Sequence, residues 1–144
     1  MDKLMLRPDQ AIEKLGNFNT PAKCINSNTP SLVLIKKEQG EGKLIDIVMS
    51  WIIDCNDFMN ISRKMNASQV KQTAIMIMND FYFMNIADIN FVFNRAKKGY
   101  YGNLYESLDG MKIYLWFDQY ATERAQTAFD DQLNEHSKIK ENRL

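Results

Sequence analysis

Apolar residues recur three and four positions apart along most of this chain, which is the pattern of helices that bury one face. The clearest stretches are 44–59, 68–83, 86–98 and a long one that begins near Asp109. A shorter helix of about Asp9–Leu15 is predicted between Pro8 and Gly16. The spacing therefore predicts an all-α fold, a compact bundle of four or five helices with a short irregular N-terminal region. Residues 1–144 are expected to form a single domain.

Three segments depart from this pattern. Residues 17–30 are rich in Asn, Thr and Pro and are expected to form an irregular connection. Ser31–Glu38 fits a short strand as well as a helix that begins near Pro30. Beyond Phe129 the sequence becomes polar, and residues 134–144 are expected to form a frayed C-terminal extension.

Helix starts are indicated by residues that accept hydrogen bonds from free backbone N–H groups. Asn66 or Ser68 is available to cap the helix after it, and Asp109 can cap the last helix. Asn85 is followed three positions later by Asp88, although the usual capping box has Glu or Gln at that second position.

Composition argues against the main classes of enzyme site. The single histidine, His136, lies in the polar C-terminal part and is expected to be a solvated surface residue, while Cys24 and Cys55 are far apart in the sequence. A zinc site requires three or four such ligands at recognisable spacing, and a catalytic nucleophile requires a nearby base. Asp80 and Asp88 could meet as a metal or acid/base pair, but roles near helix ends are the simpler interpretation. No enzyme activity, metal, cofactor or small-molecule substrate is therefore expected.

The chain has no net charge, no apolar run of bilayer length and no recognisable secretory leader. A cytoplasmic protein with reduced thiols and no membrane partner is expected. The charge is uneven, because residues 58–105 carry six Lys or Arg against two Asp or Glu. Such a locally basic region predicts one contact surface for an anionic partner, although chance would also produce it.

A basic–aromatic segment stands out within that region. Its cations Arg95, Lys97 and Lys98 close a helix, and Tyr100, Tyr101 and Tyr105 follow in a turn that Gly99 and Gly102 would shape. One interpretation is structural, because cations are favoured near a helix C-terminus and tyrosines pack well in tight turns. The other is that the cations hold phosphates while the rings stack on unpaired bases.

Several stretches between Met65 and Arg124 together resemble a known group of proteins. They are Gln72–Phe81, the helix that contains Asp88, Lys98–Tyr105 and the part from Leu108 through Trp116 and Tyr120 to Glu123 and Arg124. They resemble an uncharacterised family of Bacteroides-type bacteria and their phages, in which a Gly-x-Tyr-Gly turn precedes an Asp-Gly and a Trp-containing helix. At the level of fold, the architecture is similar to small helical phage proteins that load or regulate a replicative helicase.

The resemblance and the basic–aromatic segment lead to two hypotheses. The first is a non-enzymatic DNA-replication accessory or adaptor of a phage or mobile element, which contacts single-stranded DNA or a helicase. Five residues would make that contact: Arg95, Lys97, Lys98, Tyr100 and Tyr101. A supporting face would hold the turn in place; that face consists of Trp116, Tyr120 and Arg124.

The alternative is a protein–protein interaction or structural module, such as a virion or host-takeover component. Outward-facing Tyr100 and Tyr101 would favour the first hypothesis, and buried rings the second.

Overall fold

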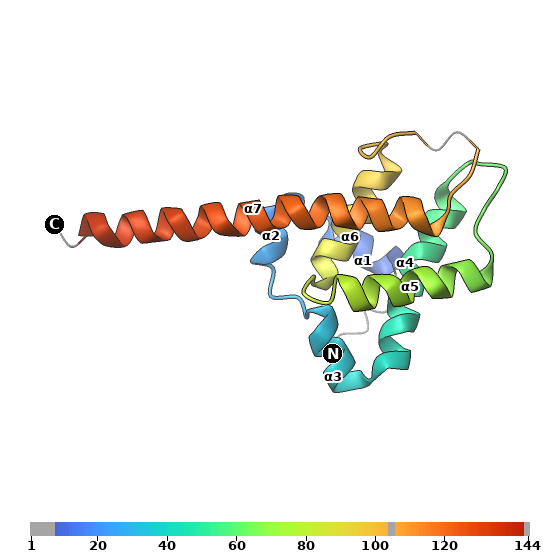
Figure 1. Cartoon of the computed structure of the whole chain (residues 1–144), viewed down its shortest axis with the longest axis horizontal. Coiled ribbons are helices and arrows are strands. Elements are labelled where there is room, and N and C mark those ends of the chain that lie inside the picture. The colour runs from blue at the N-terminus through green and yellow to red at the C-terminus, as the bar shows by residue number, and fades with distance from the viewer. Residues whose placement is uncertain (1–7, 104–105, 143–144) are drawn as a thin grey trace.

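The computed structural model describes residues 8–103 and 106–142, and within these ranges it consists of seven helices with no strand (Figure 1). The helices are α1 (Pro8–Leu15), α2 (Pro21–Ile25), α3 (Leu32–Gln39), α4 (Glu41–Phe58), α5 (Ala67–Asp80), α6 (Ile86–Lys97) and α7 (Gly110–Asn142). The prediction of an all-α fold is confirmed. There are more helices than four or five because the N-terminal third contains α2 and α3 in addition to the predicted short helix α1.

Two of those short helices lie where the sequence pattern was irregular or ambiguous. The predicted irregular connection, residues 17–30, contains α2, because Thr20 accepts a hydrogen bond from the Lys23 backbone N–H and Pro21 occupies the first turn. The ambiguous stretch from Ser31 is the helix α3, and the Ser31 hydroxyl caps it by accepting from the Leu34 N–H at 3.2 Å. Local capping therefore decides both segments in favour of helix.

The predicted starts of the longer helices are confirmed. Asn66, rather than Ser68, caps α5 in a capping box with Gln69. Asn85 and Asp88 form a capping box at α6, so the shorter Asp side chain takes the place usually held by Glu. At the start of α7, Asp109 accepts a hydrogen bond from the Lys112 N–H at 2.9 Å.

The core surrounds α6, which is buried on nearly every side by α1, α2, α4 and α7, with α5 packed between α4 and α7. The buried side chains include Trp51 of α4, Phe93 of α6 and Phe117 of α7. Aromatic contacts join the helices, for example between Phe93 and Phe117, whose ring centres are 5.5 Å apart. None of the described helices has the length and apolarity needed to cross a membrane.

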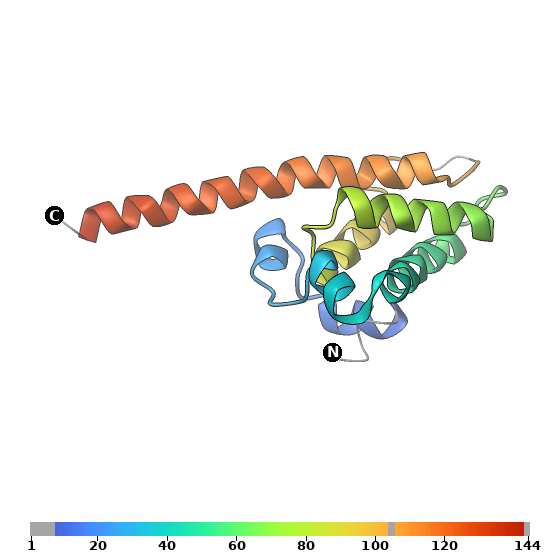
Figure 2. The ribbon, with the colours of Figure 1, turned by 60° about the horizontal axis from the view of Figure 1, so that its bottom comes forward.

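Helix α7 is much longer than the body it packs against. Its buried residues, Ile113, Trp116, Phe117 and Tyr120, all lie in its first third, and its second half projects beyond the other helices (Figure 2). Residues 134–142, part of the extension that was expected to fray, are helical in the structure; the last two residues lie outside the described ranges. The physical reason is that a polar sequence removes the buried face without breaking a helix, and no Gly or Pro follows Gly110.

Candidate functional site

The basic–aromatic segment lies at the end of α6 and in the turn after it, and its first cation is paired within the protein. The guanidinium of Arg95 donates two hydrogen bonds to the Glu123 carboxylate, at 2.6 and 3.1 Å. The same group lies 4.2 Å from the centre of the Phe91 ring and 4.1 Å from that of Tyr100. Only 17% of the Arg95 side chain is exposed, so this residue ties the turn to α7.

The other two cations point elsewhere. The Lys97 ammonium donates a 2.5 Å hydrogen bond to Asp54 of α4 and lies over the ring of Phe58. Lys98 is exposed and has no ion-pair partner among the described residues. The three cations of the segment carry a formal charge of +3, and the two carboxylates that pair with Arg95 and Lys97 reduce the local charge to +1.

The two tyrosines of the turn have different surroundings. Tyr100 is 53% exposed, whereas the ring of Tyr101 stacks on Trp116 with 5.9 Å between ring centres. The Tyr101 hydroxyl is buried without a hydrogen-bond partner among the described residues, and burial raises its pKa to about 12. The φ angles of Gly99 and Gly102, +80° and +106°, explain why glycine occupies both positions. Tyr105 lies outside the described residues.

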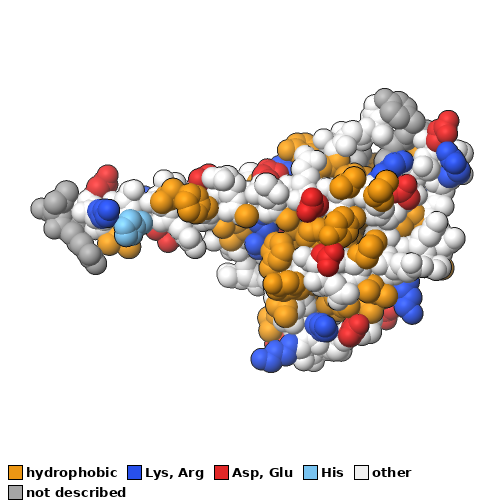
Figure 3. Space-filling model, in the orientation of Figure 1, with side chains coloured by type: hydrophobic (Ala, Val, Ile, Leu, Met, Phe, Trp, Pro, Cys, Tyr) orange, Lys and Arg blue, Asp and Glu red, His pale blue; other side chains and the backbone are white. Residues whose placement is uncertain are grey.

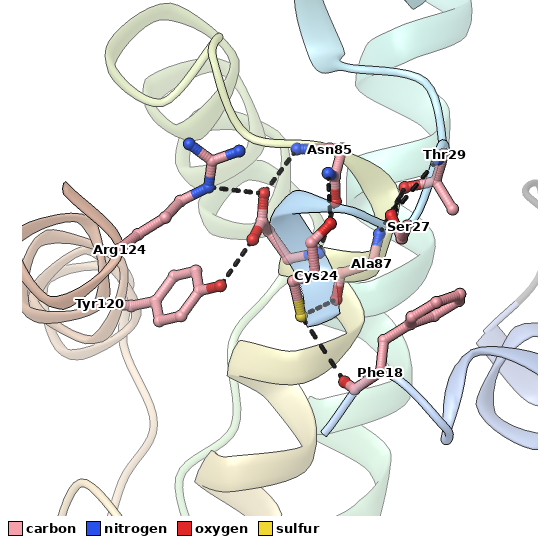
Figure 4. A network of polar contacts seen from close by, with 9 residues as sticks. Phe18, Cys24, Ser27, Thr29, Asn85, Ala87, Tyr120 and Arg124 are labelled. Carbon is pink, nitrogen blue, oxygen red and sulfur yellow. Dashed lines mark hydrogen bonds and ion pairs between the residues drawn. The ribbon is translucent and has the colours of Figure 1, made fainter. Parts of the chain in front are cut away.

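Of the predicted supporting face, Trp116 packs against the described part of the turn, through its contact with Tyr101. Tyr120 and Arg124 instead bind Asp88, whose side chain is fully buried (Figure 4). The Tyr120 hydroxyl donates to one carboxylate oxygen at 2.5 Å, while the Arg124 Nε and the Asn85 backbone N–H donate to the other at 3.0 and 2.9 Å. Burial and the neighbouring Asp88 charge raise the pKa of Tyr120 well above its usual value.

The Asp88 network extends to α2 through Cys24. Its carbonyl accepts a hydrogen bond from the Asn85 side chain at 2.8 Å, and its thiol donates to the Ala87 and Phe18 carbonyls (Figure 4). Burial, followed by the charge of Asp88, raises the pKa of the Cys24 thiol to about 12, which makes it a poor nucleophile. Because the Asp88 carboxylate is hydrogen-bonded at both oxygens, the network joins α2, α6 and α7 as a structural element.

The alternative pairing of Asp80 with Asp88 is not found. Asp80 accepts a 2.7 Å hydrogen bond from the Tyr114 hydroxyl at the surface, whereas Asp88 is inside the protein. Among the described residues, no group of three or more His, Cys, Asp or Glu is arranged to hold a metal ion. Elsewhere in the basic region of residues 58–105, Arg63 is also paired within the protein, because it lies 3.1 Å from the Glu106 carboxylate.

A surface that the sequence did not indicate lies over α5 and the first part of α7. Hydrophobic side chains gather there, with acidic groups among them (Figure 3). We call it the α5–α7 face and define it by seven residues: Met76, Asp80, Tyr82, Phe83, Met111, Tyr114 and Asp118. Its aromatic rings are linked, since Tyr82 contacts Phe83 and both Phe83 and Tyr114 contact Phe81. All seven residues except the half-buried Tyr114 are exposed. The apolar periodicity of single helices did not predict this face, because the face combines residues from two helices and a turn.

A family model described as a family of unknown function, DUF6633, matches residues 64–142. This is more than half of the chain. The chain belongs to the DUF6633 family. No curated protein and no solved structure matches this chain.

The DUF6633 region comprises α5, α6 and α7, and it therefore contains the whole α5–α7 face, the basic–aromatic segment and Asp88 with Tyr120 and Arg124. The four N-terminal helices lie outside it. They supply Asp54, which pairs with Lys97, and Cys24, which extends the Asp88 network. The family region thus carries both candidate contact surfaces, and the N-terminal helices complete their surroundings.

Proposed function

We propose that this DUF6633 protein is a non-enzymatic adaptor that binds another protein through the α5–α7 face. The observation that carries the proposal is the gathering of exposed aromatic and methionine side chains on that face. Aromatic and Met residues are enriched at interfaces, and contiguous exposed apolar patches commonly mark sites of interaction. Methionine also adapts its shape to a partner at little cost.

The charges of the face indicate the chemistry of the partner. Asp80 and Asp118 are exposed and neither has an ion-pair partner among the described residues. A complementary partner would place Lys or Arg beside apolar side chains, as a basic amphipathic helix does. The proposed setting is DNA replication of a phage or mobile element in the bacterial cytoplasm, with a replication protein such as a helicase as the partner.

Selection from a displayed library of helical peptides tests this function. We expect binders in which apolar residues recur three and four positions apart next to Lys or Arg. The Tyr82→Ser and Met111→Ser double variant should weaken their binding about tenfold or more, because both side chains would lie inside the interface. Asp80→Asn should weaken the binding of peptides that carry Lys or Arg and should make the protein discriminate less against uncharged peptides. The amide oxygen of the variant can still accept the hydrogen bond from the Tyr114 hydroxyl. Affinities would be measured by fluorescence anisotropy.

A matched control is the Ile53→Ser and Phe58→Ser double variant, which removes exposed apolar groups from α4. It should bind the selected peptides as tightly as the unmodified protein. If both double variants lost the same affinity, or if no helical peptide were selected, the α5–α7 face would not be the binding surface.

A second candidate function is contact with single-stranded DNA at Tyr100 and Lys98. The observation that favours it is the half-exposed Tyr100 ring, which is backed by the Arg95 guanidinium. A cavity of about 220 Å³ is lined by Phe18, Asn94, Arg95 and Lys98 among others, and so shares Arg95 with this contact. A base stacked on the ring and a phosphate near Lys98 would use these groups.

Anisotropy of a labelled single-stranded oligonucleotide at two salt concentrations tests the second candidate. The Lys98→Ala and Tyr100→Ala double variant should weaken binding roughly tenfold, since one base stack is worth about 1–3 kcal/mol. The affinity should also fall with salt, with a slope of about −0.7 per phosphate contacted. Lys97→Ala is the comparison and should have a smaller effect, because Asp54 already neutralises Lys97. Binding that is absent at low salt, or that is unchanged in the double variant, would exclude this contact.

A further inference from the structure

The outward face of α7 carries a regular row of exposed residues, which we call the α7 outer stripe. Its members are Asp118, Thr122, Ala125, Phe129, Leu133, His136 and Lys140, and all seven are exposed. They lie opposite the buried side of the helix. Phe129, for example, follows the buried Tyr120 by nine residues, which is about two and a half turns and places the two side chains on opposite sides.

The outer stripe is symmetric about Phe129. Asp118 and Lys140 are each eleven positions from it, Thr122 and His136 are each seven, and Ala125 and Leu133 are each four. When a second copy of the helix lies antiparallel with the two Phe129 residues face to face, every member of the stripe therefore meets its counterpart on the other copy. In this register Asp118 lies opposite the partner subunit's Lys140, and the same ion pair recurs at the other end.

We propose that two copies of this chain pair through the α7 outer stripe in this antiparallel register, with the Phe129 rings at the two-fold axis. Charge complementarity selects the orientation: parallel pairing would place Asp118 beside the partner subunit's Asp118 and Lys140 beside the partner subunit's Lys140. The small Ala125 lies opposite the larger Leu133, which lets the helices approach near the axis.

The placement of the body allows this pairing. The other helices lie mainly along the first part of α7 (Figures 1 and 2), and every member of the outer stripe is exposed. In the antiparallel pair the two bodies would lie at opposite ends and on opposite outer sides. The stripe from Asp118 to Lys140 covers about 33 Å of helix. Because few of its residues are large and apolar, we expect a weak dimer with a dissociation constant in the micromolar range or above.

Sedimentation equilibrium of the full chain tests the proposal. The unmodified protein should show a concentration-dependent dimer, and Phe129→Asp should be monomeric because it places two like charges at the axis. Phe129 is 56% exposed, so the fold should be retained, as circular dichroism would verify. Ile53→Asp is the matched control: it changes a 44% exposed apolar residue on α4 and should leave the dimer intact.

A charge exchange tests the register. Asp118→Lys should weaken the dimer several-fold, because it sets two lysine side chains against each other at both ends of the stripe. Adding Lys140→Asp should restore the original affinity, since opposite charges then face each other again. Parallel pairing would show no such rescue. A protein that stays monomeric to about 200 µM, a dimer that tolerates Phe129→Asp, or a double variant no tighter than the single one would each overturn the proposal.

This experiment is independent of the proposed adaptor function. It uses the isolated chain without a partner protein, and neither Phe129 nor Lys140 belongs to the α5–α7 face. Asp118 belongs to both surfaces, so the Phe129→Asp variant is the one to carry into the peptide-binding measurement. If Phe129→Asp abolishes the dimer but keeps peptide binding, or keeps the dimer but abolishes peptide binding, the two proposals are separated, because each outcome affects only one of them.

Discussion

Replacing Asp88 with alanine is expected to lower the free energy of unfolding by about 3–5 kcal/mol, the usual cost of breaking a buried ion pair by removing one partner. The Asp88 carboxylate is fully buried and accepts hydrogen bonds from Tyr120, Arg124 and the Asn85 backbone. Without it, the partly buried Arg124 charge and two further donors lose their acceptor, and α6 loses its capping box. Urea denaturation followed by circular dichroism measures the change.

The control for Asp88 is Asp57→Ala on the exposed side of α4, which should change stability by no more than about 0.5 kcal/mol. Tyr120→Phe should cost about 1–2 kcal/mol alone and less in the Asp88→Ala background, because the two residues share one hydrogen bond. A loss below about 1 kcal/mol for Asp88→Ala, or full additivity with Tyr120→Phe, would contradict the network as described.

Arg95→Ala is expected to cost about 1.5–3 kcal/mol, the range for hydrogen bonds to a charged group. The variant removes both bonds to Glu123 and the guanidinium that lies against Phe91 and Tyr100. Arg95→Lys should recover little of this loss, because an ammonium neither pairs in two-point fashion nor stacks as a plane. Thermal and urea denaturation would measure these changes.

Lys98→Ala is the comparison for Arg95, since Lys98 is exposed; its effect on stability should stay within about 0.5 kcal/mol. The pair of variants separates the two interpretations of the segment. If Arg95→Ala left the stability unchanged but abolished binding of single-stranded DNA, Arg95 would be a contact residue and not a link between the turn and α7.

The helical elements were predictable because their determinants are local. Apolar spacing of three and four residues marks α4 to α7, and the caps Asn66, Asn85 and Asp109 act within the first turn of the helices that they open. Where such cues were weak, as before α2 and α3, the prediction was irregular or ambiguous. In both helices one hydroxyl at the start, from Thr20 or Ser31, satisfies a backbone N–H.

The candidate site was much less predictable, because its charges are paired over long distances in the sequence. Lys97 and Asp54 are 43 residues apart, and Arg95 and Glu123 are 28 apart. A local excess of cations therefore predicted a basic surface that the fold largely neutralises. Tyr100 is exposed while Tyr101 packs on Trp116, and this difference also depends on where α7 lies, which local sequence does not show.

The sequence by itself determined that this chain is helical, where most helices begin, and that Gly99 and Gly102 shape a turn, since propensity, capping and backbone freedom act within a few residues. The tertiary structure alone decided which charges are cancelled, that Asp88 is buried among α2, α6 and α7, and that aromatic and methionine side chains form the α5–α7 face. The physical reason is that pairing and burial depend on distances between segments, which local patterns do not contain. The α7 outer stripe could be found only from the sequence and the tertiary structure together, because the sequence supplies its symmetry and the fold leaves it exposed.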